Sequence, residues 1–323
     1  MVARMESLVK FIFPFILTVL LVPVFIKILN SYSFGQNIRE EGPKTHYSKE
    51  GIPTMGGLVI LLTVIISTLL FLEWSFNIKI LLIAMVSNGL LGLIDDILNI
   101  KKTSSLGLRA KTKFFIQLII GLIIGIYLFN NNLTQLLLPF TAIDINLSYL
   151  IIPFSVILIP ATGNSVNLSD GLDGLAGGLF TVSCFAFIPI LFFLGYNQII
   201  FVIIFTISSC LGFLWYNVNP AQIFMGDTGS LYLGSFLAAI ALLTGTSLYL
   251  LFIGGVFVLI TFSVIIQVSY YKITNGRRIF KMAPIHHHFE LVGWPEVKIT
   301  MRFIILQILF SGLGIIAALP LMN

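Results

Sequence analysis

Five aspartates lie at the ends of long apolar segments of this chain: Asp95, Asp96, Asp170, Asp173 and Asp227. A charged side chain inside a bilayer costs about 2.5–3.5 kcal/mol on insertion scales, so carboxylates at such positions usually have a function. Carboxylates can hold Mg²⁺ together with water and substrate phosphates. If these segments end on the same side of a membrane, the five carboxylates can share one water-facing pocket suited to phosphate chemistry.

The composition indicates that the apolar segments are membrane helices. Of the 323 residues, 58% are apolar and 10% are charged, which is more apolar than a soluble core requires. Spans of about 20 residues can be placed at 8–29, 54–72, 79–98, 114–129, 149–163, 174–194, 198–216, 229–246, 248–271 and 301–321. The sequence therefore predicts an all-α polytopic membrane protein with ten transmembrane helices, forming a single integral membrane domain over residues 1–323.

The distribution of lysine and arginine predicts the orientation of these spans. Ten spans leave five loops on one side of the membrane, at 30–53, 99–113, 164–173, 217–228 and 272–300. Counted with Arg302, these loops carry 14 of the 18 Lys and Arg residues. The positive-inside rule makes them cytoplasmic and both termini external. The same alternation places all five aspartates at the cytoplasmic face, although acidic residues did not enter the assignment. The net charge of +5 needs no nucleic acid to explain it.

The longest predicted external loop, 130–148, contains two short apolar stretches on either side of Pro139. Short apolar stretches separated by a turn residue are typical of a β-hairpin. We therefore expect a small hairpin on the external face.

Asp95 and Asp96 differ in the helix face that they occupy. Asp95 shares a face with Asn88 and Asn99, seven residues before it and four after it. Asp96 is rotated by about 100° and points elsewhere. The alternative is that one of the pair, Asp96 more readily than Asp95, is an end charge that reaches toward the membrane interface.

Polar side chains recur at every third position in the third predicted cytoplasmic loop: Asn164, Asn167, Asp170 and Asp173. On a helix or tight turn this spacing makes one polar ridge, which suits a ligand with hydroxyl and phosphate groups. Helix capping explains one of these four residues but not all of them.

The segment from Gly226 to Ser230 leads into the eighth span. Free backbone N–H groups and the helix dipole make such a start a natural anion site. A carboxylate beside it, here Asp227, is well placed to hold Mg²⁺ against phosphate oxygens. The alternative is that Asp227 only caps the helix.

Lysine and histidine side chains supply the remaining candidates. Lys49, Lys111 and Lys113 can neutralise a diphosphate, although each alone is also explained as a topology determinant. His286 and His287 belong to a run of three histidines, whose side chains diverge by about 100° per residue on a helix. That spacing does not suit a zinc site, so it favours phosphate or nucleotide binding.

Four motifs carry a resemblance that extends over nearly the whole chain. They are Gly-Leu-Ile-Asp95-Asp96, Asn167-Leu-Ser-Asp170-Gly-Leu-Asp173, Asn217-Val-Asn-Pro-Ala-Gln-Ile-Phe224-Met-Gly-Asp227-Thr-Gly-Ser230 and Pro284-Ile-His-His-His-Phe-Glu290. Together they resemble the phospho-N-acetylmuramoyl-pentapeptide-transferase (MraY) family. The aspartate motifs are shared by the wider polyprenyl-phosphate N-acetylhexosamine-1-phosphate transferase superfamily, whereas the histidine motif is similar to the form that marks the muramoyl-pentapeptide branch.

The resemblance implies transfer of phospho-MurNAc-pentapeptide from UDP-MurNAc-pentapeptide to undecaprenyl phosphate, a membrane lipid, at the cytoplasmic face of the bacterial cytoplasmic membrane. The products are lipid I and UMP, and Mg²⁺ is the cofactor. Asp95, Asp96 and Asp227 match the catalytic aspartates, with Asp227 as the main metal ligand, and Lys111 is expected to stabilise the diphosphate. The other positions that match the nucleotide-sugar surface are Lys49, Thr54, Asn167, Asp170, Asp173, Asn217, Phe224, Ser230, Gln267, His286 and His287, with Phe224 placed to stack on uracil.

The resemblance also implies a homodimer and a groove for the prenyl chain near a bent ninth span, for which Gly254-Gly255 is the candidate bend. One alternative is a sibling transferase that uses UDP-GlcNAc with the same lipid phosphate. Another is an ion-coupled transporter, which would place its carboxylates near the middle of the membrane on broken helices. Whether an aspartate attacks the diphosphate or only assists the lipid phosphate stays open.

Overall fold

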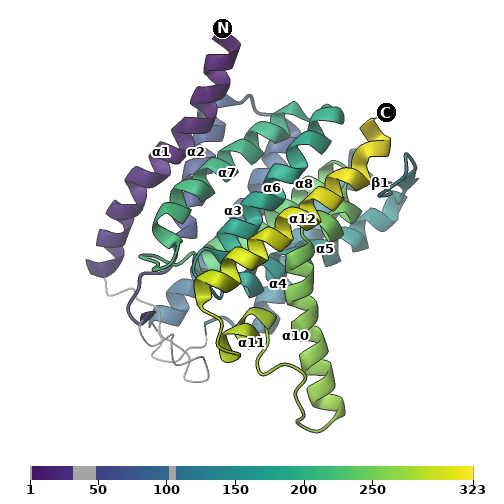
Figure 1. Cartoon of the computed structure of the whole chain (residues 1–323). Helices are drawn as coiled ribbons and strands as arrows, with labels where there is room; N and C mark the ends of the chain where they lie inside the picture. Colours follow the sequence, from purple (N-terminus) through teal and green to yellow (C-terminus); the bar gives the residue numbers. More distant parts are fainter. Residues whose placement is uncertain (1, 32–48, 102–106, 323) are drawn as a thin grey trace.

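The computed structural model describes residues 2–31, 49–101 and 107–322 as a bundle of helices (Figure 1). The parts of the first two predicted cytoplasmic loops at 32–48 and 102–106 lie outside these residues. The helices are α1 (Val2–Ser31), α2 (Gly57–Phe71), α3 (Phe76–Lys101), α4 (Ala110–Asn130), α5 (Ile151–Ser169), α6 (Leu175–Phe193), α7 (Asn197–Asn217), α8 (Gly226–Leu243), α9 (Leu250–Ile253), α10 (Gly255–Ile273), α11 (Ile285–Leu291) and α12 (Glu296–Met322).

The helices confirm an all-α polytopic membrane protein. Within the described part of the chain, nine helices are long and apolar enough to cross a membrane. The predicted second span, 54–72, is the shorter apolar helix α2 of 15 residues. At 1.5 Å per residue such a helix is about 22 Å long, less than the hydrocarbon thickness of about 30 Å. The count of ten spans therefore stays a prediction.

Helix α8 is the centre of the bundle, and all of its residues from Thr228 to Leu243 are buried. Two glycines let neighbouring helices reach its first turn. A Cβ atom on Gly92 of α3 would lie 2.2 Å from the Asp227 carbonyl oxygen, and one on Gly57 of α2 would lie 2.1 Å from the Gly229 Cα. Because no larger side chain fits at either position, α2 and α3 pack directly against the start of α8.

The predicted ninth span is broken at its two adjacent glycines, Gly254 and Gly255. Helix α9 ends at Ile253 and α10 begins at Gly255. The Gln307 side chain of α12 fills the break: its Oε1 accepts the Val256 N–H at 3.1 Å, and its Nε2 donates to the Ile253 carbonyl. The predicted bend is confirmed, and beyond it α10 leans away from the bundle (Figure 1).

Strands β1 (Gln135–Leu137) and β2 (Asp144–Asn146) form an antiparallel pair, with Gln135 opposite Asn146. The predicted hairpin in the 130–148 loop is confirmed. Figure 1 shows both ends of the chain and this hairpin in the upper part of the view, while α11 lies at the lower end of the bundle. The two termini thus lie toward the same end, as an even number of spans requires.

Candidate active site

Three helices bring two carboxylates to one lysine. Lys113, in the first turn of α4, donates from Nζ to Asp95 Oδ2 on α3 at 3.0 Å and to Asp227 Oδ2 on α8 at 2.8 Å. The Asp95 side chain is 3% exposed, whereas those of Lys113 and Asp227 are 21% and 24% exposed. This transfer cluster, Asp95, Lys113 and Asp227, therefore opens toward water on the side of Asp227.

Asp95 is held by its own helix and by the segment before α4. Asn99, one turn along α3, donates to Oδ2 at 3.3 Å, and the Leu108 N–H donates to Oδ1 at 2.6 Å. The expected pairing of Asp95 with Asn99 is thus present. Asn88, the third member of the predicted polar face, donates instead to the Ala84 carbonyl of its own helix at 3.0 Å.

Asp96 caps the start of α8. Its carboxylate accepts the backbone N–H groups of Asp227 and Thr228 at 3.0 and 2.9 Å and the Thr228 hydroxyl at 2.6 Å. Thr54 lies beside this cap, since a Cβ on Gly226 would be 2.6 Å from Asp96 Oδ2 and 2.8 Å from Thr54 Oγ1. The helix start that we expected to bind a phosphate is therefore occupied by a carboxylate of the protein itself.

The predicted polar ridge divides between two sites because α5 ends at Ser169. Asn167 donates to Asp227 Oδ1 and to Ser230 Oγ, both at 2.8 Å, and so orients the transfer cluster. Asn164 lies one turn deeper and donates to Gln117 Oε1 of α4 at 2.8 Å. Asp170 and Asp173 belong to the turn that follows, so they extend in other directions.

Asp170 lies in the turn between α5 and α6. Burial raises the pKa of its carboxyl group to about 7, and the charges of Asp227 and Asp173 add to this effect, while the Gly226 N–H lowers the pKa. Near neutral pH this carboxyl group can therefore donate a hydrogen bond as well as accept one.

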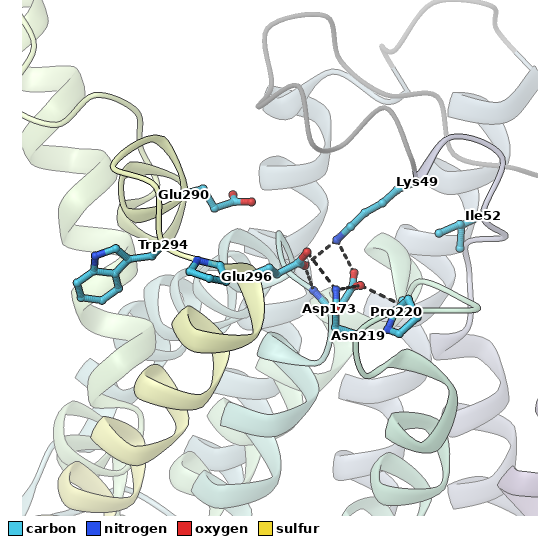
Figure 2. A pocket seen from close by; sticks show the side chains of 10 residues that line it. Lys49, Ile52, Asp173, Asn219, Pro220, Glu290, Trp294 and Glu296 are labelled. Carbon is cyan, nitrogen blue, oxygen red and sulfur yellow. Dashed lines mark hydrogen bonds and ion pairs between the residues drawn. The ribbon is translucent and has the colours of Figure 1, made fainter.

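A second lysine is also shared by two carboxylates. Lys49 Nζ lies 2.6 Å from Asp173 Oδ1 and 2.6 Å from Glu296 Oε1, as Figure 2 shows, and 5.9 Å from the centre of the Phe224 ring. Burial lowers the pKa of Lys49, but its hydrogen bonds and ion pairs with the two carboxylates outweigh burial, so the pKa lies above its ordinary value. Lys49 is thus a fixed positive charge.

These groups line a pocket of about 340 Å³. It is formed by Lys49, Ile52, Asp173, Asn219, Pro220, Ala221, Glu290, Trp294, Pro295 and Glu296 (Figure 2). Three of these side chains are carboxylates and one is a lysine. We call this space the acidic pocket; its charge suits an uncharged group with hydrogen-bond donors better than a phosphate.

Asn217 and Gln267, both predicted to contact substrate, hold the backbone in place. Asn217 accepts the Gly174 N–H at 3.1 Å and donates to the Ile223 carbonyl at 2.8 Å. Gln267 accepts from the backbone of residues 279 and 280 at 3.1 and 3.0 Å and donates to the carbonyl of residue 280 at 2.9 Å. Each amide uses its oxygen and its nitrogen to fix a loop of the site.

Two of the three consecutive histidines face the turn between α5 and α6. The rings of His286 and His287 have centres 4.3 Å apart, and a Cβ on Gly171 would lie 2.5 Å from His286 Nε2 and 3.0 Å from His287 Nε2. His287 Nδ1 lies 2.6 Å from Glu290 Oε2. His288 instead accepts the backbone N–H of residue 281. Helix α11 therefore presents two imidazoles to the aspartate motif.

Lys111 is exposed. Two residues along a helix turn the side-chain direction by about 200°, so Lys111 and Lys113 lie on different faces of α4. The face of α4 on which each lysine lies decides which of the two meets the aspartates. Lys113 lies on the inner face, because Gln117, four residues further on the same face, is buried. Glu296 and Asn219 line the acidic pocket but are not among the site residues predicted from the sequence. A pattern on α12 points to Glu296, because Thr300, Phe303 and Gln307 follow it on the buried face of the helix.

The chain is similar to known proteins over most of its length. A family model described as glycosyl transferase family 4 matches residues 77–245, and phospho-N-acetylmuramoyl-pentapeptide-transferase signature 1 matches residues 49–61. Relatives named phospho-N-acetylmuramoyl-pentapeptide-transferase include that of Halalkalibacterium halodurans, 42% identical over 314 residues, which cover 95% of this chain and 96% of the relative. That of Staphylococcus carnosus is 43% identical over 311 residues, which cover 94% of this chain and 97% of the relative. That of Clostridioides difficile is 39% identical over 306 residues, which cover 94% of this chain and 95% of the relative.

The chain belongs to the phospho-N-acetylmuramoyl-pentapeptide-transferase family. The family predicted from the motifs is thereby confirmed. The match at 77–245 includes all five aspartates, and the signature at 49–61 includes Lys49 and Thr54. Bacterial relatives and apolar helices together confirm a multi-pass protein of the bacterial cytoplasmic membrane.

Replacing Lys113 should reduce turnover far more than replacing Lys111. In Lys113→Gln the charge between Asp95 and Asp227 is lost, and removing one electrostatic stabiliser of a transition state typically costs about 10²–10³ in kcat. The matched control Lys111→Gln removes an exposed charge and should retain the parental rate. Steady-state kinetics of the two purified variants make the comparison, and equal losses would contradict the role given to Lys113.

Asp95→Asn and Asp96→Asn should fail in different ways. Asp96 accepts three hydrogen bonds at the start of α8, and hydrogen bonds to charged groups contribute about 1.5–3 kcal/mol each. Asp96→Asn should therefore lower the thermal unfolding temperature as well as the activity. Asp95→Asn should lower kcat and should reduce that temperature by less, because Lys113 keeps Asp227 as an ion-pair partner and Asp96 still caps the start of α8. Thermal unfolding in detergent, measured beside kcat, separates the two, and an unchanged unfolding temperature for Asp96→Asn would refute the capping role.

Proposed function

We propose that this protein transfers phospho-MurNAc-pentapeptide from UDP-MurNAc-pentapeptide to undecaprenyl phosphate at the cytoplasmic face of the membrane, forming lipid I and UMP. The observation that carries the proposal is the transfer cluster: Asp95, Lys113 and Asp227 meet where α3, α4 and α8 end or begin. A transporter would be expected to place such carboxylates near the middle of the membrane. Carboxylates at helix ends favour chemistry at the interface.

The cluster suits phosphoryl transfer, which depends on positioning and charge neutralisation more than on covalent chemistry. Lys113 is held between two carboxylates and can turn its ammonium group toward phosphate oxygens of the donor. Of the adjacent pair, Asp95 is the reactive carboxylate, because it shares Lys113 with Asp227, whereas both oxygens of Asp96 accept hydrogen bonds from the start of α8. Asn167 orients Asp227 through Oδ1.

Asp227 is the proposed main ligand of Mg²⁺, with Asp95 beside it. Lys113 Nζ lies within 3.0 Å of both carboxylates, so the two already accommodate a cation between them. Within the described residues no group of three or more His, Cys, Asp or Glu side chains is arranged to hold a metal ion. Mg²⁺ needs only one or two carboxylates when water and phosphates complete its shell. When bound, it would neutralise charge on the diphosphate oxygens.

The acidic pocket is the proposed site of the uridine part of the donor. Its carboxylates and Lys49 offer partners to the hydroxyl and imide groups of a nucleoside, and the Phe224 ring beside Lys49 offers a surface on which uracil can stack. The diphosphate would then extend toward Lys113. His286 and His287 of α11 pack on Gly171, in the turn that carries Asp170 and Asp173, and are the proposed contacts of the sugar phosphate.

Helix α10 is the proposed surface for the prenyl chain of the acceptor. After the break at Gly254 it leaves the bundle (Figure 1), and it exposes large apolar side chains: Leu259, Phe262, Ile265, Ile266 and Ile273. Thr261 Oγ1 donates to Ser165 Oγ of α5 at 2.8 Å, which ties this helix to the one that carries Asn167. A lipid lying along α10 would therefore have its phosphate near the transfer cluster.

The orientation of the protein can be tested with single cysteines. We propose ten spans, with α2 as the short one, both termini external and the transfer cluster cytoplasmic. In a background with alanine at the buried Cys184 and Cys210, Arg277→Cys should react with a membrane-impermeant maleimide only from the cytoplasmic side. Asn131→Cys should react only from outside. Reaction of Arg277→Cys from outside would overturn the common cytoplasmic pocket and the mechanism with it.

The reaction is tested with purified protein and defined substrates. UMP should be released from UDP-MurNAc-pentapeptide only when both polyprenyl phosphate and Mg²⁺ are present, and Asp227→Asn should release none while remaining folded. UDP-GlcNAc should be a very poor donor, because sites that hydrogen-bond a substrate group reject analogues lacking it by up to about 10⁴–10⁵. Comparable rates with the two donors would favour the sibling UDP-GlcNAc transferase instead.

A further inference from the structure

Glu296, the first residue of α12, joins three segments that are distant in the sequence. Its Oε1 accepts Lys49 Nζ at 2.6 Å and the Asp173 N–H at 2.7 Å, and its Oε2 accepts Asn219 Nδ2 at 3.3 Å. These donors come from the segment before α2, the turn between α5 and α6, and the loop between α7 and α8. One carboxylate therefore sets how these segments meet.

An acidic residue in the first turn of a helix is ordinarily explained by the helix dipole. That explanation does not account for these contacts, because the Glu296 side chain is only 16% exposed and accepts three hydrogen bonds from outside its own helix. Thr300, one turn further along α12, donates to the Asp173 carbonyl at 3.3 Å. The same face of α12 thus holds the Asp173 turn at two points.

Glu296 also decides where the Lys49 charge lies. The two carboxylate oxygens of Asp173 have different partners. Oδ1 accepts a hydrogen bond from Lys49 Nζ, and Oδ2 accepts from Asn219 Nδ2 at 3.0 Å and from the Ala221 N–H at 3.1 Å. Asn219 is therefore shared by both carboxylates. Without the Glu296 charge, Lys49 keeps one anionic partner, and the Asp173 N–H loses its charged acceptor.

We propose that Glu296 is a positioning residue for the nucleoside part of the donor. It holds Lys49, Asp173 and Asn219 in the arrangement that the acidic pocket presents to an uncharged, donor-bearing group such as uracil or ribose. The inference rests on the proposed function, in which this pocket binds uridine. In the described part of the chain, the hydrogen bonds of Glu296 join it to Lys49, Asp173 and Asn219 and not to the transfer cluster, so Glu296 acts on donor binding and not on the transfer step.

The first test separates binding from turnover. Glu296→Gln should raise KM for UDP-MurNAc-pentapeptide by about 10–100-fold, the loss expected for hydrogen bonds to a charged group. Its kcat and its KM for polyprenyl phosphate should not change, and Glu296→Asp, which keeps the charge, should recover part of the affinity. The matched control is Glu73→Gln, which removes an exposed glutamate and should bind donor normally. A loss in kcat with donor KM unchanged would overturn the proposal.

Direct binding distinguishes failure of this proposal from failure of the proposed function. Calorimetry with UMP and UDP needs no transfer reaction. Absence of uridine nucleotide binding in the parental protein would refute the proposed function. Equal binding by the parental protein and Glu296→Gln would refute only the role of Glu296. If Glu296→Gln does not fold, the same comparison with Glu296→Asp applies, and it should bind more weakly than the parental protein.

A double-mutant cycle tests whether Glu296 acts through Lys49. In a Lys49→Met background the positioned cation is absent, so Glu296→Gln should weaken UDP binding by much less than it does in the parental protein. Fully additive losses would show that the two residues act independently and would overturn the positioning role.

Discussion

The close contact between α3 and the start of α8 is the constraint on which the rest of the site depends. It requires glycine at position 92, because a Cβ there would overlap the Asp227 carbonyl. It is completed by Asp96, which accepts the N–H groups of Asp227 and Thr228. Once Asp96 is bound in this way, the helix turn directs Asp95 to the other side, toward Lys113. Capping by one aspartate therefore positions its neighbour beside Lys113.

The site repeats one electrostatic arrangement. Lys113 is shared by Asp95 and Asp227, and Lys49 is shared by Asp173 and Glu296. In each case the carboxylates come from different helices or turns, so each lysine joins elements that apolar packing alone would not align. Each group also carries one more negative charge than positive charge. A bound cation can balance the first group, whereas the second is better matched by neutral groups that donate hydrogen bonds, so the two groups differ in the ligands that they favour.

Membership of the phospho-N-acetylmuramoyl-pentapeptide-transferase family gives this arrangement its reaction. The histidine helix α11 packs against Gly171 in the turn that carries Asp170 and Asp173. Glu296 follows α11 closely in the chain and contacts the same turn. The loop that contains α11 and the start of α12 therefore both contact the turn between α5 and α6.

The sequence by itself determined the membrane class, the family, the clustering of the five aspartates at helix ends, the hairpin in 130–148 and the break at Gly254. The membrane class, the gathering of the aspartates and the hairpin follow from apolar segments, charge bias and turn residues, all of which are local. The family and the break at Gly254 follow from the resemblance that the motifs carry. Only the tertiary structure showed that Lys113, and not the exposed Lys111, contacts Asp95 and Asp227, that Asp96 caps α8, that Gln267 supports the backbone and that Glu296 joins the segments around Lys49. Each of these depends on helix phase and on the partner met across the bundle, since neighbouring residues on one helix point in directions about 100° apart and chain position alone does not say which direction is buried.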